Sequence, residues 1–205
     1  MIAARPALGR RGVVAGVGRE AAYVEADGFV VVLSVAPPVL PNGAQVARLP
    51  AVGEEVVVHA GEIWDPRIET LAAGDVPADG PDDLARALAT RDPARAAEVG
   101  ARLIGRGGGL TPEGDDLLAG AAAVVAAGPW PAKDEWLRAL LGEDLRRRTT
   151  ALSATLLELA AAGMGPEPLQ AWLAGDRAAL ARLTAIGHST GRAIATGAAL
   201  ALANV

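Results

Sequence analysis

The sequence contains no cysteine, and it has one lysine and two histidines in 205 residues. The lack of cysteine excludes a thiol nucleophile, a thiolate zinc site, an iron–sulfur cluster and a disulfide. Two histidines cannot form a three-histidine zinc site. Lys133 follows no glycine-rich loop, so the ATP-binding P-loop pattern is absent. These gaps remove several enzyme classes before any motif is considered.

Acidic residues outnumber basic ones, which gives a formal net charge of −5, and only 3% of the residues are aromatic. Nucleic-acid binding usually needs basic patches and stacking platforms, so we expect no nucleic-acid partner. The longest apolar run, Leu117 to Trp130, has 14 residues. A bilayer-spanning helix needs about 20, and no signal-peptide pattern follows the N-terminal arginines. We therefore expect a cytoplasmic protein without a membrane partner.

The chain changes character near residue 75, and we expect two parts, residues 1–75 and 76–205. The first part carries short β-type runs, and Asp27-Gly28 between runs 21–26 and 29–35 is a hairpin signal. Further runs lie at 13–17, 45–49 and 55–60. This pattern predicts a small antiparallel sheet or partial barrel, and His59 near its end is interpreted as structural.

The second part has helical patterns, which makes the expected fold class α+β with a β-rich part followed by a compact, mainly helical part. Asp92-Pro93 is typical of a helix start, and Gly163, Gly175 and Gly187 are typical of helix ends. The predicted helices cover residues 81–90, 93–104, 112–127, 131–148, 150–162, 166–174, 176–186 and 189–202. The helix at 112–127 is apolar nearly all round, so we expect it to be central and buried.

The segment GRGGGLTPEGDDLLAG, residues 105–120, has the composition of a ligand-binding helix start. Thr111 fits the N-cap and Pro112 the first helical position. Free N–H groups and the positive helix dipole end there suit an anion. Glycines let a ligand approach the backbone, so the candidate ligand-binding residues here are Thr111 with Gly107, Gly108, Gly109 and Gly114.

Asp115 and Asp116 follow at once and are candidate catalytic residues. They can orient a substrate, hold a divalent cation, or act as acid or base. The alternative is that acidic residues in a first turn merely complement the helix dipole. Because two carboxylates about 100° apart on a buried helix cannot both easily reach water, the functional interpretation is favoured.

A second polar helix start is RRRTTALSATLL, residues 146–157. Thr149 or Thr150 can cap the helix, and Ser153 lies one turn further on, so all three are candidate ligand-binding residues. Arginines beside these hydroxyls would suit a phosphate or carboxylate. Alternatively, the arginines only end the preceding helix, where cations are favoured.

The third polar helix start is IGHSTGRAIATG, residues 186–197. Ser189 or Thr190 can cap the helix, and Gly191 lies in its first turn, so these three are candidate ligand-binding residues. His188 is a candidate general acid–base, with the alternative that it satisfies backbone carbonyls at the junction.

The candidate hydroxyl residues of the three segments are six of the twelve serines and threonines of the chain, namely Thr111, Thr149, Thr150, Ser153, Ser189 and Thr190. This concentration predicts that the three helix starts share one site.

The same three segments resemble a bacterial family, the AllH-like family, long catalogued as a domain of unknown function. GGGLTPEGDDLLAG resembles its G-x-G-L-T-P-S-G-D-D-x-L-x-G signature, with Glu113 in place of the usual serine. Residues 149–163 resemble its T-x-x-S-x-x-x-L block, and residues 186–197 its G-H-S-S-G block. The resemblance spans residues 105–202.

The resemblance implies a subunit of oxamate carbamoyltransferase, which acts in allantoin degradation, a branch of purine catabolism. That enzyme transfers a carbamoyl group between oxalurate and phosphate, giving oxamate and carbamoyl phosphate. The implied partners are a small anionic metabolite and other carbamoyltransferase subunits. Two alternatives stay open: a non-catalytic assembly module, and a stand-alone enzyme whose Asp115 and Asp116 hold Mg²⁺ or Mn²⁺. No cofactor is firmly implied.

Overall fold

The computed structural model describes residues 9–58, 65–72 and 80–205. The chain divides into two compact units, Met1–Pro66 and Arg67–Val205, each described here by itself. Residue 75, near which two parts were expected to meet, and His59 lie outside the described residues. Residues 67–72 contact the helical unit, because the Ile68 N–H donates to Gly163 O at 2.8 Å and the Ala72 N–H to Leu173 O at 2.6 Å.

The first unit is a five-stranded sheet in the order β4-β3-β2-β1-β5. Its strands are β1 (Arg11–Val17), β2 (Ala21–Ala26), β3 (Phe29–Ser34), β4 (Gly43–Gln45) and β5 (Glu55–Val57). The hairpin turn at Asp27-Gly28 is confirmed, and both residues have positive φ, as a two-residue turn requires. All pairs are antiparallel except β3 with β4, which is parallel, so the sheet is mixed. The expected β-rich unit is therefore present.

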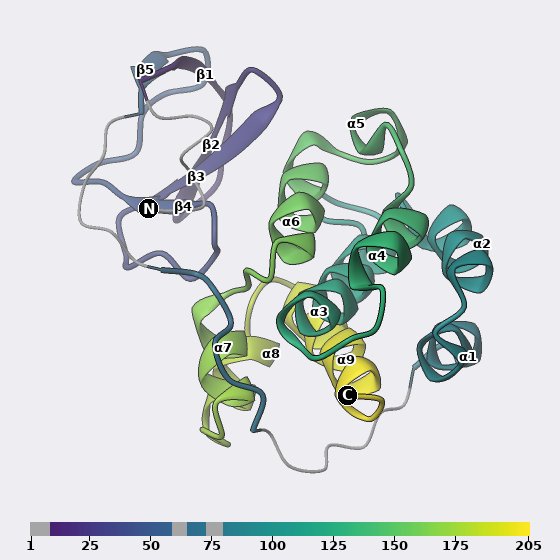
Figure 1. Ribbon diagram of the computed structural model, residues 1–205. Helices are drawn as coiled ribbons and strands as arrows, with labels where there is room; N and C mark the ends of the chain where they lie inside the picture. Colours follow the sequence, from purple (N-terminus) through teal and green to yellow (C-terminus); the bar gives the residue numbers. More distant parts are fainter. Residues whose placement is uncertain (1–8, 59–64, 73–79) are drawn as a thin grey trace. The chain divides into compact units, whose positions relative to one another are not determined.

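The second unit is helical, and its helices surround a central pair (Figure 1). They are α1 (Asp82–Thr90), α2 (Pro93–Leu103), α3 (Glu113–Ala127), α4 (Lys133–Leu141), α5 (Leu145–Arg148), α6 (Ala151–Ala161), α7 (Glu167–Leu173), α8 (Ala179–Thr184) and α9 (Thr190–Leu202). Figure 1 shows α1 and α2 on one side of the α3–α9 pair and α6 and α7 on the other. The α+β fold class is confirmed.

The central pair packs closely because glycines lie at the crossing. A Cβ on Gly120 would be 2.0 Å from Ile194 O, and a Cβ on Gly197 would be 1.9 Å from Leu117 O. Neither backbone could approach the other so closely with a larger residue. Helix α3 is buried along nearly its whole length, as its sequence predicts.

The single helix predicted over 131–148 is wrong, since the chain breaks it into α4 and α5. Gly142 and Asp144 both have positive φ, which ends the helical geometry. The Arg148 guanidinium lies against the break and donates to Leu141 O at 3.0 Å and to Gly100 O at 3.1 Å. It thereby satisfies a carbonyl at the end of α4 and ties α4 to α2.

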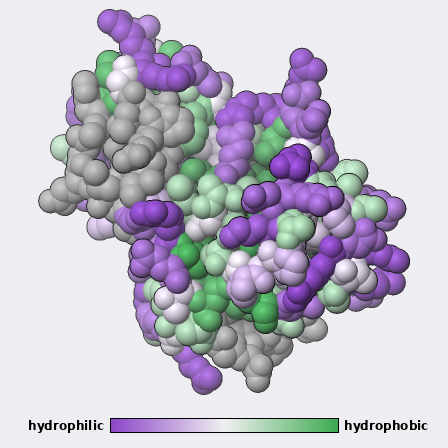
Figure 2. Space-filling view, viewed as in Figure 1, coloured by the Kyte–Doolittle hydropathy of each residue, from purple (hydrophilic) through white to green (hydrophobic). Residues whose placement is uncertain are grey.

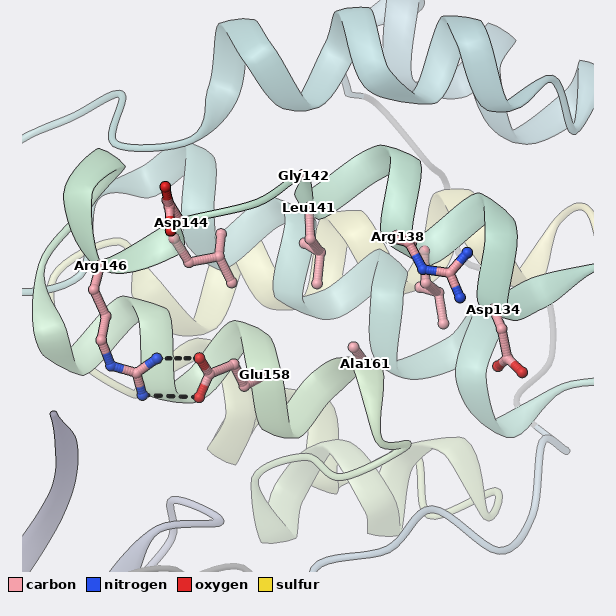
Figure 3. Close-up of a pocket in the computed structure, with 10 residues that line it drawn as sticks. Asp134, Arg138, Leu141, Gly142, Asp144, Arg146, Glu158 and Ala161 are labelled. Atoms are coloured by element: carbon pink, nitrogen blue, oxygen red, sulfur yellow. Dashed lines mark hydrogen bonds and ion pairs between the residues drawn. The ribbon is translucent and has the colours of Figure 1, made fainter. Parts of the chain in front are cut away.

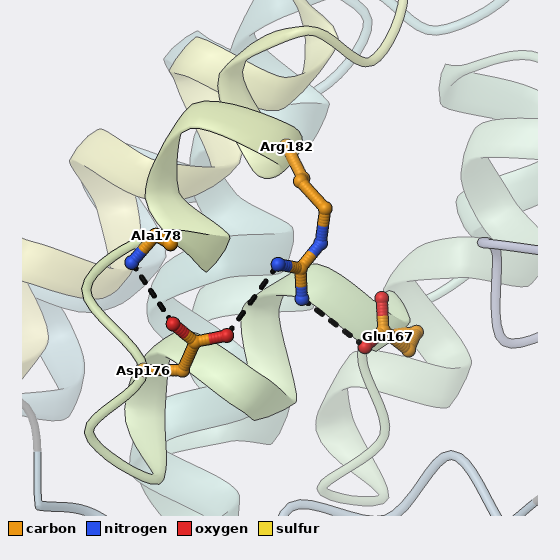
Figure 4. Close-up of polar contacts among 4 residues, drawn as sticks. All are labelled: Glu167, Asp176, Ala178 and Arg182. Atoms are coloured by element: carbon orange, nitrogen blue, oxygen red, sulfur yellow. Dashed lines mark hydrogen bonds and ion pairs between the residues drawn. The ribbon is translucent and has the colours of Figure 1, made fainter.

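The connection between α7 and α8 shows why the helix predicted over 176–186 begins later. The Asp176 carboxylate accepts a hydrogen bond from the Ala178 N–H at 2.9 Å, which holds a turn before α8 (Figure 4). Arg182 reaches back to Asp176 and to Glu167, both at 3.4 Å. These ion pairs are about half exposed, so each adds only about 0–1 kcal/mol.

Figure 2 shows polar side chains over much of the face in view, with apolar ones between them. Within residues 9–58, 65–72 and 80–205, no helix is long and apolar enough to cross a membrane.

Candidate functional site

Asp115 is a buried carboxylate that receives one hydrogen bond from the beginning of its own segment and one from the second predicted segment. It is 2% exposed. The Gly105 N–H donates to its Oδ1 at 2.7 Å, and the Thr149 hydroxyl donates to its Oδ2. Each oxygen of this carboxylate therefore has a donor, which offsets the cost of burying it. Asp115 joins the glycine-rich segment and the start of α6 to the first turn of α3.

Asp116 is equally buried but only partly satisfied. Its carboxyl group hydrogen-bonds the Thr190 and Thr111 hydroxyls, which are themselves 2.8 Å apart. Its Oδ2 has no hydrogen-bond partner among the described residues. Burial raises the pKa of Asp116 to about 7; the two hydroxyls oppose this shift, and the charges of Asp115 and Glu113 add to it. Asp116 can therefore exchange a proton near neutral pH.

Thr150 links the glycine-rich segment to α6. Its hydroxyl oxygen accepts from the Ser153 N–H at 3.1 Å, so the predicted N-cap is confirmed. The same hydroxyl donates to Leu110 O at 2.6 Å. Ser153 is 1% exposed, and its Oγ has no hydrogen-bond partner in the described part of the chain. A buried polar group without a partner costs about 1–3 kcal/mol.

The glycine-rich segment folds back over the first turn of α3. Gly107 has φ +128°, and a Cβ there would be 2.6 Å from the Glu113 nitrogen. The Gly114 N–H donates to Arg106 O at 2.9 Å, and a Cβ on Gly114 would be 2.2 Å from Leu103 O. Gly114 is therefore needed for chain packing. Gly108 is exposed, and a Cβ there would have open space around it.

Two expectations about the start of α3 are corrected. Pro112 is the N-cap residue and no side chain caps the helix, because Thr111 faces Thr190 and Asp116 instead. The expected free N–H groups are largely occupied, since those of Asp115 and Asp116 donate to Pro112 O and that of Gly114 to Arg106 O. An anion at this helix start would have to rely on hydroxyl groups more than on backbone N–H groups.

The start of α9 contributes Thr190 to the hydrogen bonds with Thr111 and Asp116. Ser189 occupies the N-cap position of α9, as predicted, but its side chain makes no capping hydrogen bond. A Cβ on Gly191 would be 1.7 Å from Leu183 O, so this glycine permits α8 and α9 to approach. His188 is exposed, and its backbone carbonyl accepts a hydrogen bond from Arg192 at 2.5 Å.

The three predicted helix starts thus meet through hydrogen bonds. We call the six hydrogen-bonded side chains the polar cluster: Thr111, Asp115, Asp116, Thr149, Thr150 and Thr190. The side chains of His188 and Ser189 are not joined to it by any hydrogen bond among the described residues, and Gly109 is exposed on the loop.

Two residues that support the cluster were not singled out from the sequence. Gly105, with φ +76°, supplies the N–H that Asp115 accepts, and a Cβ there would be 2.3 Å from Arg148 O. Arg148 fixes the chain directly before Thr149 through its bonds to two backbone carbonyls. A glycine beside a glycine-rich run is a weak sequence signal, and nothing in the sequence marks Arg148 apart from its two neighbouring arginines.

The described residues contain no group of three or more His, Cys, Asp or Glu side chains placed to hold a metal ion. Mg²⁺ or Mn²⁺ at Asp115 would have to displace the Gly105 N–H or the Thr149 hydroxyl. The geometry of Asp115 is therefore that of a positioned acceptor for protein donors.

A separate groove of about 560 Å³ lies between the α4–α5 segment and α6 (Figure 3). Leu137, Leu141 and Leu145 lie among its lining residues. Arg146 and Glu158 form an ion pair at one side, with Nη2 2.9 Å from Oε2. None of the residues predicted for the site lines this groove.

Comparison with known protein families gives a match to part of the chain. The family model described as oxamate carbamoyltransferase subunit AllH matches residues 103–202, which include the whole polar cluster. No curated protein and no solved structure matches the chain significantly.

Proposed function

Over residues 103–202 this chain belongs to the AllH family, and on that premise we propose that it is a subunit of an oxamate carbamoyltransferase whose polar cluster binds the small substrate. The family model supports an association with that enzyme. The binding role of the cluster is our own proposal. We place oxamate, phosphate or carbamoyl phosphate at the meeting point of the three helix starts.

One observation carries the proposal: scarce polar residues from three distant segments meet around two buried carboxyl groups. Thr111 meets Thr190 across 79 positions of the chain, and Thr149 meets Asp115 across 34. A helical unit stabilised by apolar packing alone has no need to bury two adjacent acidic residues, and their burial costs free energy. Costly buried groups of this kind often mark functional sites.

The carboxyl group of Asp116 suits the proton transfer that carbamoyl transfer requires. In the proposed reaction, a phosphate oxygen attacks the carbamoyl carbon of oxalurate, and the bond from that carbon to the oxamate nitrogen breaks. Phosphate loses one proton and the departing nitrogen gains one. A carboxyl group that titrates near neutral pH can take the first proton and return it to the nitrogen.

A second interpretation is that the cluster only holds three helix ends together. The mutual bonds of Thr111 with Thr190 and of Asp115 with Gly105 favour this assembly role, since they need no ligand. The two interpretations predict different effects when a hydroxyl is removed. An assembly role predicts lost stability with unchanged ligand affinity, and a binding role predicts weaker ligand binding.

Calorimetric titration with oxamate, phosphate and carbamoyl phosphate tests the proposal on the purified chain, alone and with the other subunits of its assembly. We expect binding of at least one of these ligands, and at least tenfold weaker binding by Thr190→Val. The matched control is Thr90→Val on α1, where the hydroxyl donates to carbonyls of its own helix. Equal binding by all three proteins, or binding by none, would contradict the proposal.

A further inference from the structure

Asp116 presents a hydrogen-bonding position that no described residue fills. Its Oδ2 is buried and has no donor within the described residues, while the rest of the carboxyl group is held by Thr111 and Thr190. Buried polar atoms in native proteins nearly always have a partner, so an exception needs an explanation. A bound ligand that donates a hydrogen bond is such an explanation.

The position of this atom separates it from other unsatisfied atoms in the described residues. The indole nitrogens of Trp130 and Trp136 belong to rings packed at 5.5 Å, and Asn42 lies in the sheet unit. By contrast, Asp116 and Ser153 occupy the first turns of α3 and α6, helices that pack against each other. One offers a free acceptor and the other a free hydroxyl donor.

We propose that Asp116 accepts a hydrogen bond from the N–H₂ of a primary amide, and that it thereby selects an amide ligand over the carboxylate of the same shape. This inference rests on the proposed function, because it assigns one end of the proposed ligand to one residue. A primary amide carries an N–H donor, which matches the free acceptor of Asp116.

Charge gives the selectivity its direction. Asp115, Asp116 and Glu113 lie within four positions of one another at the start of α3, and the charges of Asp115 and Glu113 both act on Asp116. A second carboxylate brought to Asp116 would meet like charge in a buried place, where screening by water is weak. The neutral amide escapes this repulsion, and its N–H gains a strong bond to an ionised acceptor.

Oxamate and oxalate form the test pair, since oxalate carries a carboxylate where oxamate carries the amide. Dissociation constants are measured by calorimetry near pH 7 for the wild-type chain, Asp116→Asn and the control Asp83→Asn. We expect the wild-type chain to bind oxamate at least tenfold more tightly than oxalate. Asp116→Asn should reduce the ratio to within about threefold, because its amide can donate to a carboxylate. Asp83 lies on α1 and pairs with Arg102, so its variant should keep the wild-type ratio.

Proton release provides a second measurement, which a merely structural role would not change. A donor bound to Asp116 favours its ionised form, so oxamate should release protons near pH 7 from the wild-type chain and not from Asp116→Asn. The release is read from calorimetry in two buffers of different ionisation enthalpy. If Asp116→Asn does not fold, the wild-type ratio and the wild-type proton release decide the matter.

The outcomes separate this inference from the function on which it rests. Equal affinity of the wild-type chain for oxamate and oxalate would overturn the selectivity and leave the proposed function standing. If the folded chain with its partner subunits binds none of oxamate, oxalate, phosphate and carbamoyl phosphate, both the selectivity and the proposed function are overturned.

Discussion

At the residue scale, the two adjacent carboxyl groups of α3 have different surroundings. Asp115 has a donor at each oxygen, whereas Asp116 has two hydroxyl partners and one oxygen that no described residue contacts by a hydrogen bond. Two residues with the same side chain and the same burial thus serve as a fixed acceptor and as a group that titrates near neutral pH.

Asp116 should make the stability of the chain fall as the pH rises from about 4 to about 7. Its pKa is raised from 3.8 to about 7 by burial, so the folded chain keeps a proton that the unfolded chain loses in this interval. The stabilisation is complete below the unfolded pKa and is lost as the pH passes the folded pKa, for a total of up to about 4 kcal/mol. Chemical denaturation of the wild-type chain and Asp116→Asn between pH 4 and 8 measures the difference, and a difference independent of pH would contradict the assignment.

Thr149→Val should destabilise the chain by about 1–3 kcal/mol, because one oxygen of the buried Asp115 loses its hydroxyl donor. Thr90→Val provides the comparison. Its side chain is exposed on α1, so we expect a change within about 0.5 kcal/mol. Urea denaturation of both variants at one pH gives the two changes in the free energy of unfolding. Equal changes would contradict a stabilising role of the Thr149 hydrogen bond.

At the element scale, the first turn of α3 is held by the segment that precedes it. The Gly114 N–H, the close approach of Gly107 and the Thr150 bond to Leu110 O all fix this segment. The sequence correctly predicts the helix that follows this segment. Its contacts depend on residues from α6 and α9, which no local pattern specifies.

Alanine substitution along this segment should distinguish its glycines. Gly107→Ala should cost about 1–3 kcal/mol, because φ is +128° and a Cβ would lie 2.6 Å from the Glu113 nitrogen. Gly108→Ala should be neutral or stabilise slightly, since its Cβ would meet open space and alanine restricts the unfolded chain. Thermal unfolding of the two variants checks this order, and a larger loss for Gly108→Ala would contradict the geometry.

At the scale of the whole molecule, short-range signals were sufficient for most of the fold. The hairpin at Asp27-Gly28 and the helix start at Asp92 follow from local chemistry, and the structure has both. The break after α4 was missed because Arg148 stabilises it through Leu141 O and Gly100 O. The sequence predicts an antiparallel sheet, and the parallel pairing of β4 with β3 differs from this prediction. Strand direction, like the helix break, depends on tertiary contacts that no local pattern specifies.

The sequence also predicts part of the candidate site. The clustering of scarce hydroxyl groups predicted that three helix starts share one place, and the bonds of Thr111, Thr149 and Thr150 join them. The difference between Asp115 and Asp116 was not predictable, because it depends on which partner each carboxyl group meets in the folded chain.

The central claim is that these three helix starts bind one ligand. Backbone-amide NMR of the labelled chain during titration with oxamate tests it most directly. We predict that the amides of Gly107, Thr150 and Gly191 shift together along one binding isotherm, while those of Leu137 and Leu141 in the separate groove stay unchanged. Shifts confined to one helix start, or centred on the groove between α4 and α6, would contradict it.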